Sequence, residues 1–310
     1  MAFHRIVADE QPYFIPPMAL SLKTFSRLIN YLRKFYTIIG LNQIIPVIDG
    51  DSSKNGRFLC LTFDDGYRDN FEVAVPILKR FGLPATFFVP VQQIDREEPY
   101  WWDYLYEVYR NNVDGFRSWL KSVDSKLSHM IDHDPKDQRI NLPRNLVRHL
   151  NWYSDKDRER FLGKMKSHFG PYSGRRQLMS WAELNRLSME GFSIGSHCIS
   201  HIPLTDLSSD TAKKEIFLSK LILERRIKAT VKGFSYPRGS YKTNHVRMVQ
   251  QAGYSYAVTT KFSSNRRDCN RFTLARRNVS DFYGLRSLIP VGMHLLETTG
   301  WLDPLLTNRR

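Results

Sequence analysis

The chain has 310 residues, of which 42% are hydrophobic and 13% aromatic, enough to fill one large α/β domain or two smaller ones. Its net charge of +15 indicates attraction to anions such as an acidic polysaccharide or an anionic membrane surface. No apolar run reaches the ~18 residues that cross a bilayer, and no zinc-finger spacing or RNA-binding signature occurs, which disfavours membrane-spanning and nucleic-acid-binding proteins.

The first residues, MAFHRIVADEQPYF, contain no basic segment that leads into an apolar one, so no secretory signal is predicted. Three cysteines cannot form a fully paired disulfide framework. Both features favour a cytoplasmic protein, with a processed form of a longer chain as the alternative. The basic charge adds the expectation of peripheral attachment to the inner face of the membrane.

Short apolar runs bounded by turn residues predict strands, and amphipathic stretches that predict helices follow most of them. The predicted strands are 3–7, 44–48, 58–63, 85–90, 192–196, 232–236, 254–260 and 272–279. Predicted helices include 71–81, a helix that opens with the capping box Ser180–Glu183, and 242–252. Alternation of strand and helix predicts a mostly parallel sheet, closed or open.

Residues from about 100 to 176 interrupt this alternation. The stretch is mostly helical in pattern, is rich in charged and aromatic residues, and contains Trp101 and Trp102. We predict that it is an insertion on the rim of a single domain spanning residues 1–310, and not a second domain. The insertion either covers a site or only packs against the rim.

The first motif with chemical potential is Asp64-Asp65-Gly66, directly after the predicted strand 58–63. Two adjacent carboxylates repel each other and raise each other's pKa. An ordinary Asp-Gly surface turn is one explanation. The other is a bound cation, which would make both carboxylates tolerable, with one as a metal ligand and the other as a nearby base.

Polar residues also follow two later predicted strands. His197 and His201 come four positions apart after the fifth strand, and a turn containing Pro237 and Gly239 follows the sixth. Active sites of parallel barrels lie at the C-terminal ends of the strands. Two imidazoles and a carboxylate suit Zn²⁺, and also Fe²⁺, Co²⁺ or Ni²⁺. Structural histidines and an ordinary turn are the alternative.

These motifs resemble those of a known family. Thr62–Tyr67 is similar to the first motif of the polysaccharide deacetylases, the NodB-like carbohydrate esterases. Ser196–His201 resembles their histidine motif, and Tyr236–Gly239 resembles their third motif. A subgroup linked to exopolysaccharide production is similar at Phe3–Ile6, Tyr100–Asp103 and Ala257–Thr260. The resemblance implies a distorted (β/α)₇ barrel and metal-dependent removal of N-acetyl or O-acetyl groups from glycans.

By position, the resemblance implies that Asp65, His197 and His201 hold a divalent metal, with Zn²⁺ favoured, and that Asp64 is the general base. The metal would polarise the acetyl carbonyl and acidify its bound water. The resulting oxyanion would be stabilised by the metal and by the backbone N–H of Arg238. A general acid must protonate the leaving amine, because an amide anion is too basic to depart unaided.

Aromatic and turn residues near the motifs are candidates for binding the substrate. Tyr241 and Trp102 could stack on sugar rings, although packing in the core is the usual role of a tryptophan. The third-motif residues Tyr236, Pro237 and Gly239 complete the predicted substrate-binding set.

Two departures from the family pattern concern the base and the acid. Ser235 stands where many relatives carry an arginine that steadies the base. The candidates to replace that arginine are Arg68, Arg238, Arg276 and Arg277.

The acid is the second departure, since residues 272–278 contain no histidine where many relatives have a Leu-x-His motif. His4 and His294 are the candidates, and a structural role is the ordinary reading of each.

We predict a metal-dependent hydrolase that removes acetyl groups, chiefly N-acetyl groups, from a polysaccharide or a lipid-linked glycan. A metal-dependent hydrolase of a small non-peptide amide and a glycan-binding relative without catalysis are the alternatives. The intact set Asp64, Asp65, His197 and His201 speaks against the binding protein, because binding alone requires no base beside a metal.

Overall fold

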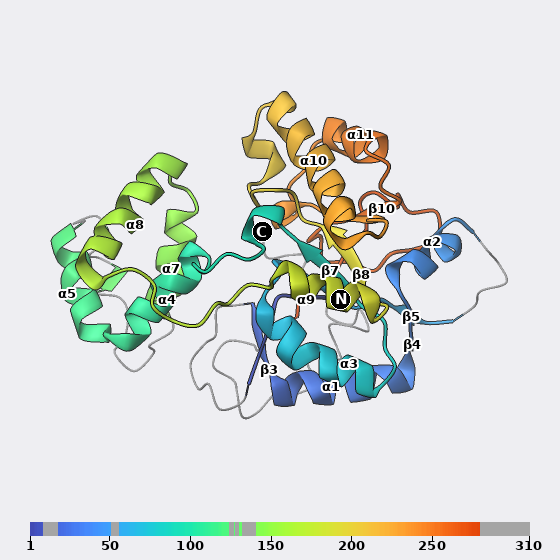
Figure 1. The fold of residues 1–310 in the computed structure, drawn as a ribbon, viewed down its shortest axis with the longest axis horizontal. Coiled ribbons are helices and arrows are strands. Elements are labelled where there is room, and N and C mark those ends of the chain that lie inside the picture. Colours follow the sequence, from blue (N-terminus) through green and yellow to red (C-terminus); the bar gives the residue numbers. More distant parts are fainter. Residues whose placement is uncertain (9–17, 51–55, 124–126, 128–129, 132–140, 280–310) are drawn as a thin grey trace. The chain divides into compact units, whose positions relative to one another are not determined.

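The computed structural model describes residues 1–8, 18–50, 56–123, 127, 130–131 and 141–279. The chain divides into two compact units (Figure 1). The first contains the described residues of 1–10, 18–96 and 178–310, and the second contains those of 97–177.

A six-stranded parallel sheet forms the centre of the first unit. Its strands lie in the order β1-β6-β7-β8-β9-β10. They comprise β1 (Ala2–Phe3), β6 (Thr62–Phe63), β7 (Thr86–Val89), β8 (Ser193–Ser196), β9 (Gly233–Ser235) and β10 (Tyr256–Val258). The C-terminal ends of these parallel strands therefore meet at one edge, where polar residues from several strands come together.

The sheet closes on itself through residues 274–279. Leu274 forms a parallel bridge with Val258 of β10, and Asn278 forms another with Ala2 of β1. Six strands and this closing segment make a curled parallel barrel, so the predicted fold class is confirmed.

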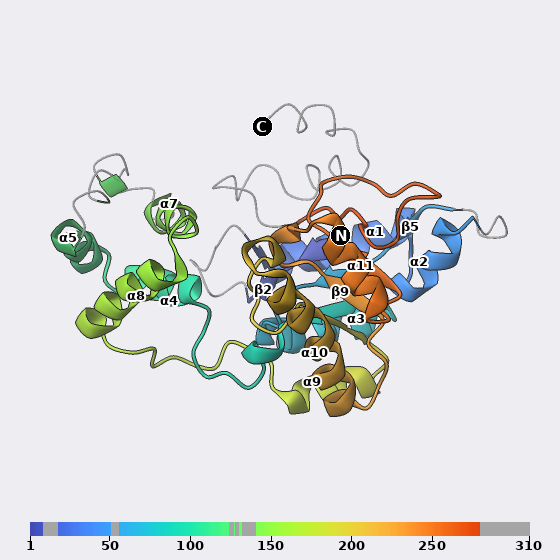
Figure 2. The same ribbon diagram turned by 90° about the horizontal axis from the view of Figure 1, so that it is seen from above.

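Two short parallel pairs, β2–β3 and β4–β5, accompany the barrel. Their bounds are Arg5–Val7, Ala19–Ser21, Thr37–Ile38 and Phe58–Leu59. Helices arranged around the strands complete the unit (Figures 1 and 2). They are α1 (Leu22–Phe35), α2 (Leu41–Ile48), α3 (Val75–Arg80), α9 (Trp181–Met189), α10 (Ser209–Ile227) and α11 (Thr243–Gln251).

The predicted helices are present, and their local chemistry explains where they begin. The helix predicted at 71–81 starts as a π-helical turn, Asn70–Ala74, and continues as α3. Pro76 lacks the N–H that an α-helical ladder needs, and the wider preceding turn accommodates its ring. Helix α9 begins at the predicted capping box, in which Glu183 N–H donates to Ser180 Oγ at 3.2 Å.

The strand predicted at 44–48 is wrong, because these residues form the second half of α2. A short unbroken apolar run does not distinguish a strand from a helix by periodicity. Gln43 settles the local choice, since its side chain accepts the N–H of Gly40 at 2.9 Å and caps the helix. Leu41 and Ile48, two turns apart, are then buried on one face.

Alternate residues of each strand face opposite sides of the barrel wall. Phe87 belongs to the large core formed with the helices, whereas its neighbour Phe88 packs in a separate cluster with Tyr256. Small residues make room for these rings. A Cβ on Gly195 would lie 2.3 Å from the Phe88 ring, and one on Gly233 would lie 2.5 Å from the Tyr256 ring. The barrel is thus filled by side chains and is not a pore.

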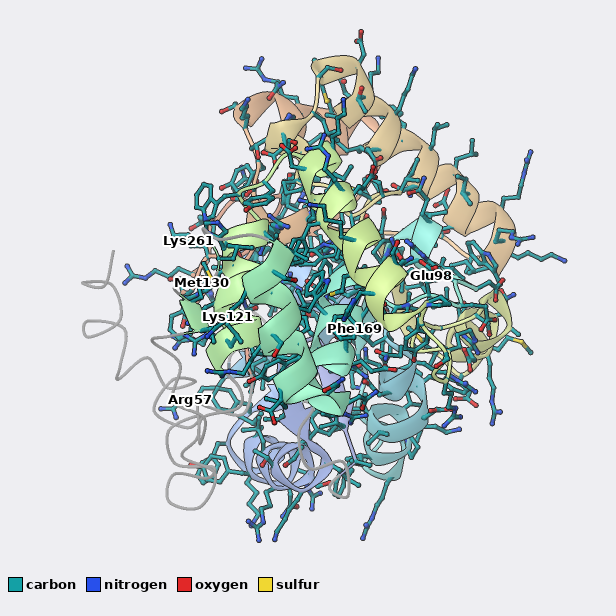
Figure 3. All side chains as sticks on the ribbon, turned by 90° about the vertical axis from the view of Figure 1, so that its left-hand side faces the viewer. Arg57, Glu98, Lys121, Met130, Phe169 and Lys261 are labelled. Atoms are coloured by element: carbon teal, nitrogen blue, oxygen red, sulfur yellow. The ribbon has the colours of Figure 1, made fainter. Side chains whose placement is uncertain are left out.

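The second unit is helical and has its own core. Its helices include α4 (Trp101–Asn111), α5 (Val113–Val123), α7 (Asn141–Leu150) and α8 (Asp155–Phe169). Phe116 and Trp119 of α5 pack against Phe169 at the end of α8, with ring centroids 5.9 and 5.4 Å apart. Figure 3 labels Phe169 among the side chains of this unit. The unit covers the stretch predicted to be an insertion, and its status as part of a single domain stays a prediction. None of the described helices is both long and apolar enough to cross a membrane.

Candidate active site

Asp64 and Asp65 follow β6 at its C-terminal end, and both are buried, with 2% of each residue exposed. Asp65 and Gly66 both have φ near +71°, in the left-handed region. The backbone therefore turns sharply after Asp64, and the two carboxylates find different partners. This divergence explains physically how one turn tolerates two adjacent acids.

Arg276 of the closing segment is the partner of Asp64. Its Nη1 donates to Asp64 Oδ1 at 2.8 Å, and its Nη2 donates to Oδ2 at 2.6 Å. The remaining N–H groups reach Thr62 Oγ1 at 3.0 Å, Ser235 Oγ at 3.0 Å and the Thr259 carbonyl at 2.9 Å. All five guanidinium N–H groups are thus used, which is what a buried charge requires.

This pairing sets the charge of Asp64. Burial alone would raise its pKa, but the charge and hydrogen bonds of Arg276 outweigh burial and lower the pKa below its ordinary value. The neighbouring His197 and His4 act in the same direction. Asp64 is therefore an ionised carboxylate at neutral pH, the form that can accept a proton.

The other three arginines that the sequence offered as partners of the base have different surroundings. Arg68 donates to a glutamate of α9 at 3.0 Å, and Arg277 donates to a serine hydroxyl at 3.1 Å. The Arg238 side chain is exposed. Arg276 is thus the candidate that contacts Asp64.

Asp65, His197 and His201 lie together and could hold a metal ion. One ligand atom from each lies within 4.8 Å of the others. Asp65 Oδ1 is 3.4 Å from His197 Nε2 and 3.1 Å from His201 Nε2. His197 Nδ1 lies 2.7 Å from the Ser235 carbonyl, which can only accept, so Nδ1 carries the proton and Nε2 offers its lone pair. This donor set fits a catalytic divalent metal.

The pKa values of the three groups have distinct causes. Burial would raise the pKa of Asp65, but the neighbouring imidazoles of His201 and His197 hold it well below the usual range. Burial dominates at His201 and lowers its pKa. For His197, burial is outweighed by Asp65 and Asp64, and the pKa is raised. The lowered pKa of His201 favours the neutral imidazole, the form that binds a metal.

The third-motif turn has an unusual backbone. Arg238 has φ +55° and Gly239 has φ +71°. A Cβ on Gly239 would lie 2.1 Å from Thr260 Oγ1 and 2.7 Å from its backbone nitrogen. Thr260 Oγ1 in turn donates to the Arg238 carbonyl at 3.1 Å. Only glycine fits this close approach, which fixes the path of the backbone after Arg238. The charge of the Arg238 side chain also helps to lower the pKa of His201.

The remaining predicted substrate-binding residues differ in exposure. Tyr236 and Pro237 are buried, and the Tyr236 hydroxyl donates to the Phe272 carbonyl at 3.2 Å. Tyr241 is 38% exposed and stacks on Tyr236, with ring centroids 4.9 Å apart. Trp102 belongs to the second unit, where it stacks on Tyr100. The binding roles of these residues stay predictions.

Of the two candidate acids, the structure describes His4. His4 lies between β1 and β2 and contributes to the lowered pKa of both Asp64 and Asp65. Its carbonyl accepts a hydrogen bond from the Asn70 side chain at 2.9 Å. His294 lies outside the described residues.

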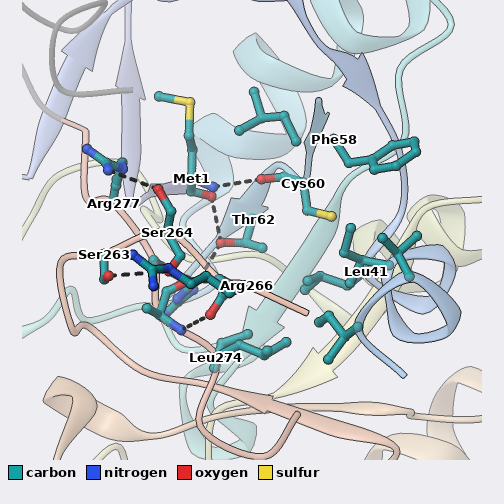
Figure 4. Close-up of a pocket in the computed structure, with 18 of the residues that line it drawn as sticks. Met1, Leu41, Phe58, Cys60, Thr62, Ser263, Ser264, Arg266, Leu274 and Arg277 are labelled. Carbon is teal, nitrogen blue, oxygen red and sulfur yellow. Dashed lines mark hydrogen bonds between the residues drawn. The ribbon is translucent and has the colours of Figure 1, made fainter. Parts of the chain in front are cut away.

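A cavity of about 340 Å³ also lies in the first unit (Figure 4). Apolar residues such as Leu41 and Phe58 line it together with Arg266 and Arg277. Arg276 contributes to its wall, but none of the two aspartates and two histidines of the candidate site does. The cavity is therefore distinct from the place where those four residues meet.

The family model described as polysaccharide deacetylase matches residues 51–126 and 155–257. The chain belongs to the polysaccharide deacetylase family. Among curated members, the putative polysaccharide deacetylase YxkH of Bacillus subtilis (strain 168) is 20% identical over 230 residues, which are 74% of this chain and 54% of that protein. The chain thus spans about half the length of that relative.

Solved structures share the fold. The Streptococcus pyogenes deacetylase PplD in complex with acetate superposes with a TM-score of 0.59 at 15% identity, over 95% of each chain. IcaB from Ammonifex degensii gives 0.58 at 15% identity, over 90% of this chain and 92% of its own. A de-N-acetylase from Aggregatibacter actinomycetemcomitans gives 0.57 at 17%, over 93% and 97%. At these identities the likeness shows the deacetylase barrel alone.

Proposed function

We propose that this protein is a metal-dependent deacetylase that removes acetyl groups, chiefly N-acetyl groups, from a polysaccharide or a lipid-linked glycan. The observation that carries the proposal is the ionised Asp64, fixed by Arg276, beside the donor set of Asp65 and two histidines. Membership of the polysaccharide deacetylase family supports a glycan as the substrate.

Asp65, His197 and His201 would hold the metal, with Zn²⁺ favoured by two nitrogen donors and one oxygen donor. When bound, such an ion supplies Lewis-acid polarisation of the acetyl carbonyl and acidifies water. The Ser235 carbonyl keeps the Nε2 of His197 available as a donor.

The chain's own residues would divide the reaction between them. Asp64 accepts the proton of the attacking water, while Arg276 holds its carboxylate ionised and in one orientation. The N–H of Arg238 donates to the oxyanion that forms on the acetyl carbon. The C–N bond then breaks as His4 protonates the departing amine, and acetate is the second product.

The substrate and setting are also proposals. Tyr241 offers an exposed aromatic face to a sugar ring, with Trp102 as the second candidate, and Tyr236, Pro237 and Gly239 shape the turn. The segments Phe3–Ile6 and Ala257–Thr260 support an exopolysaccharide as the polymer. The net charge of +15 supports work at an anionic inner membrane face in the cytoplasm, within a single domain of residues 1–310.

Two variants test the proposed deacetylase. Metal content and acetate release from N-acetylglucosamine oligomers are measured on the same samples. We expect Asp64→Asn to keep stoichiometric metal and to lose about 10²-fold or more in turnover, because the base is gone and the ligands remain. We expect His197→Ala to lose the metal.

Two results would contradict the proposal. Bound metal without acetate release from any glycan would favour a small-amide hydrolase or a glycan-binding protein. Absence of metal under all loading conditions would mean that the buried donor set has a structural role.

A further inference from the structure

Glu215 is an acidic residue on the inward face of α10, between Ala212 and Ile216, and only 8% of it is exposed. A buried carboxylate is costly unless it is hydrogen-bonded. Glu215 Oε2 accepts the backbone N–H groups of Ile199 at 2.7 Å and of Ser200 at 3.0 Å. Its Oε1 accepts the Ser200 hydroxyl at 2.8 Å. A position on the inward face of α10 is thus occupied by a carboxylate whose three hydrogen bonds go to the turn at residues 199–200.

That turn connects the two histidines of the candidate metal site, and its backbone is strained. Cys198 has φ +64° and His201 has φ +66°, a region that non-glycine residues rarely adopt and that surrounding contacts must enforce. On one side, the N–H groups of Val91 and Gln92 donate to the carbonyls of Cys198 and Ile199 at 3.1 and 3.0 Å. The N–H groups on the opposite edges of these two peptides are those of Ile199 and Ser200, which donate to Glu215 of α10.

We propose that Glu215 is a positioning residue for the metal site: it anchors the turn after His197 and so sets where His201 Nε2 meets Asp65. The inference rests on the proposed function only in assuming that the site holds a metal. The proposal follows from the hydrogen bonds of the turn. Its carbonyls accept from the segment after β7, and its N–H groups donate to Glu215. Without the Glu215 hydrogen bonds, the strained residues Cys198 and His201 can relax toward ordinary backbone angles.

Glu224 on the same helix offers a matched control. Its Oε1 accepts the backbone N–H of Val231 at 3.0 Å and pairs with Lys220 at 2.8 Å. It therefore also ties α10 to a following loop, but within the described part of the chain it makes no hydrogen bond to the histidine turn. A loss that reflects only the anchoring of α10 should appear in Glu224→Gln as well as in Glu215→Gln.

The experiment measures Co²⁺ binding to the full chain by competition with a chelator, together with the visible absorption of the Co²⁺ form and thermal unfolding without metal. We expect Glu215→Gln to weaken Co²⁺ binding about tenfold and to alter the absorption bands, because the amide cannot accept both N–H groups without turning its own NH₂ toward the Ser200 hydroxyl. Glu215→Ala should weaken binding by about 100-fold. Glu224→Gln should change neither the affinity nor the spectrum.

The proposal is overturned if the Glu215 variants bind Co²⁺ with the parent's affinity and spectrum and only unfold at lower temperature. If neither variant folds, Ser200→Ala decides, since it removes one of the three hydrogen bonds and keeps the carboxylate. Weaker Co²⁺ binding by Ser200→Ala supports the proposal, and unchanged binding overturns it. A parent protein that binds no Co²⁺ would instead refute the proposed function, so the two failures are distinguishable.

Discussion

Asp64 and Arg276 form a buried ion pair in which each partner compensates the burial of the other. Attraction between two buried charges roughly offsets their loss of hydration, but removing one partner leaves the second uncompensated. Arg276 is 4% exposed and also lies over the Phe88 ring, with 5.6 Å between its guanidinium carbon and the ring centroid. The pair therefore couples the stability of the barrel interior to the charge of the proposed base.

Replacing Arg276 should change the pH dependence of the enzyme. The proposed base Asp64 would act as a carboxylate, and its lowered pKa would keep it ionised into the acidic range. In Arg276→Gln, burial dominates and the pKa of Asp64 rises, so the acidic limb of kcat/KM moves to higher pH. The free energy of unfolding should also fall by about 3–5 kcal/mol. A pH–rate profile and urea unfolding measure the two effects.

Arg277→Gln is the control for this prediction, because Arg277 is equally near the end of the barrel wall but donates to Ser264. It should leave the acidic limb in place. An acidic limb that stays put in Arg276→Gln would mean that Arg276 does not govern the ionisation of Asp64.

Between the residue and the whole molecule, the elements show where sequence reasoning succeeds. The positions of the site residues at the strand ends could be predicted, because the predicted strands stop directly before Asp64, His197 and Pro237. The sequence alone leaves four candidates for the arginine that contacts the proposed base. Alternation along the closing segment favours Arg276, since it stands in phase with the buried Phe272 and Leu274.

Other features of the site lie beyond sequence patterns. Glu215 looks like one more charge on a polar helix, and only the packing of α10 against the histidine turn shows that it is buried. The residues 44–48 follow the same lesson in reverse, because a run of apolar residues fits either a strand or α2 until the cap at Gln43 is known. Tertiary contacts decide both cases, and local propensity does not.

The third-motif turn allows a matched pair of substitutions. Gly239 and Gly253 have φ of +71° and +77°, so alanine is strained at both. At Gly239 the new Cβ would also collide with Thr260, whereas at Gly253 the nearest atom lies 4.0 Å away on a lysine side chain. We expect Gly253→Ala to cost about 1 kcal/mol in the free energy of unfolding, and Gly239→Ala to cost about 1–3 kcal/mol more. Urea unfolding of both variants measures the difference, and equal losses would contradict the close approach.

At the scale of the whole molecule, the described apolar clusters of the two units share no residue. Separate cores indicate that the units need not unfold together. We expect calorimetry to show more than one transition. Phe116→Ala, at a fully buried position of the second unit, should lower the temperature of one transition, with a loss of about 3–5 kcal/mol in the free energy of unfolding. Phe25→Ala in the first unit should lower the temperature of another transition. A single transition that both variants lower equally would contradict this separation.

The closing segment also bears on the order in which the protein is synthesised. Asp64 and Arg276 are 212 positions apart, while Asp65 and both histidines precede Arg276 in the chain. A growing polypeptide therefore carries all three candidate metal donors well before it carries the arginine that fixes the base. Contacts so distant in sequence are slow to form because the loop between them must first be closed. A nascent chain that ends before residue 276 therefore contains the candidate metal ligands but lacks the arginine that holds the proposed base ionised.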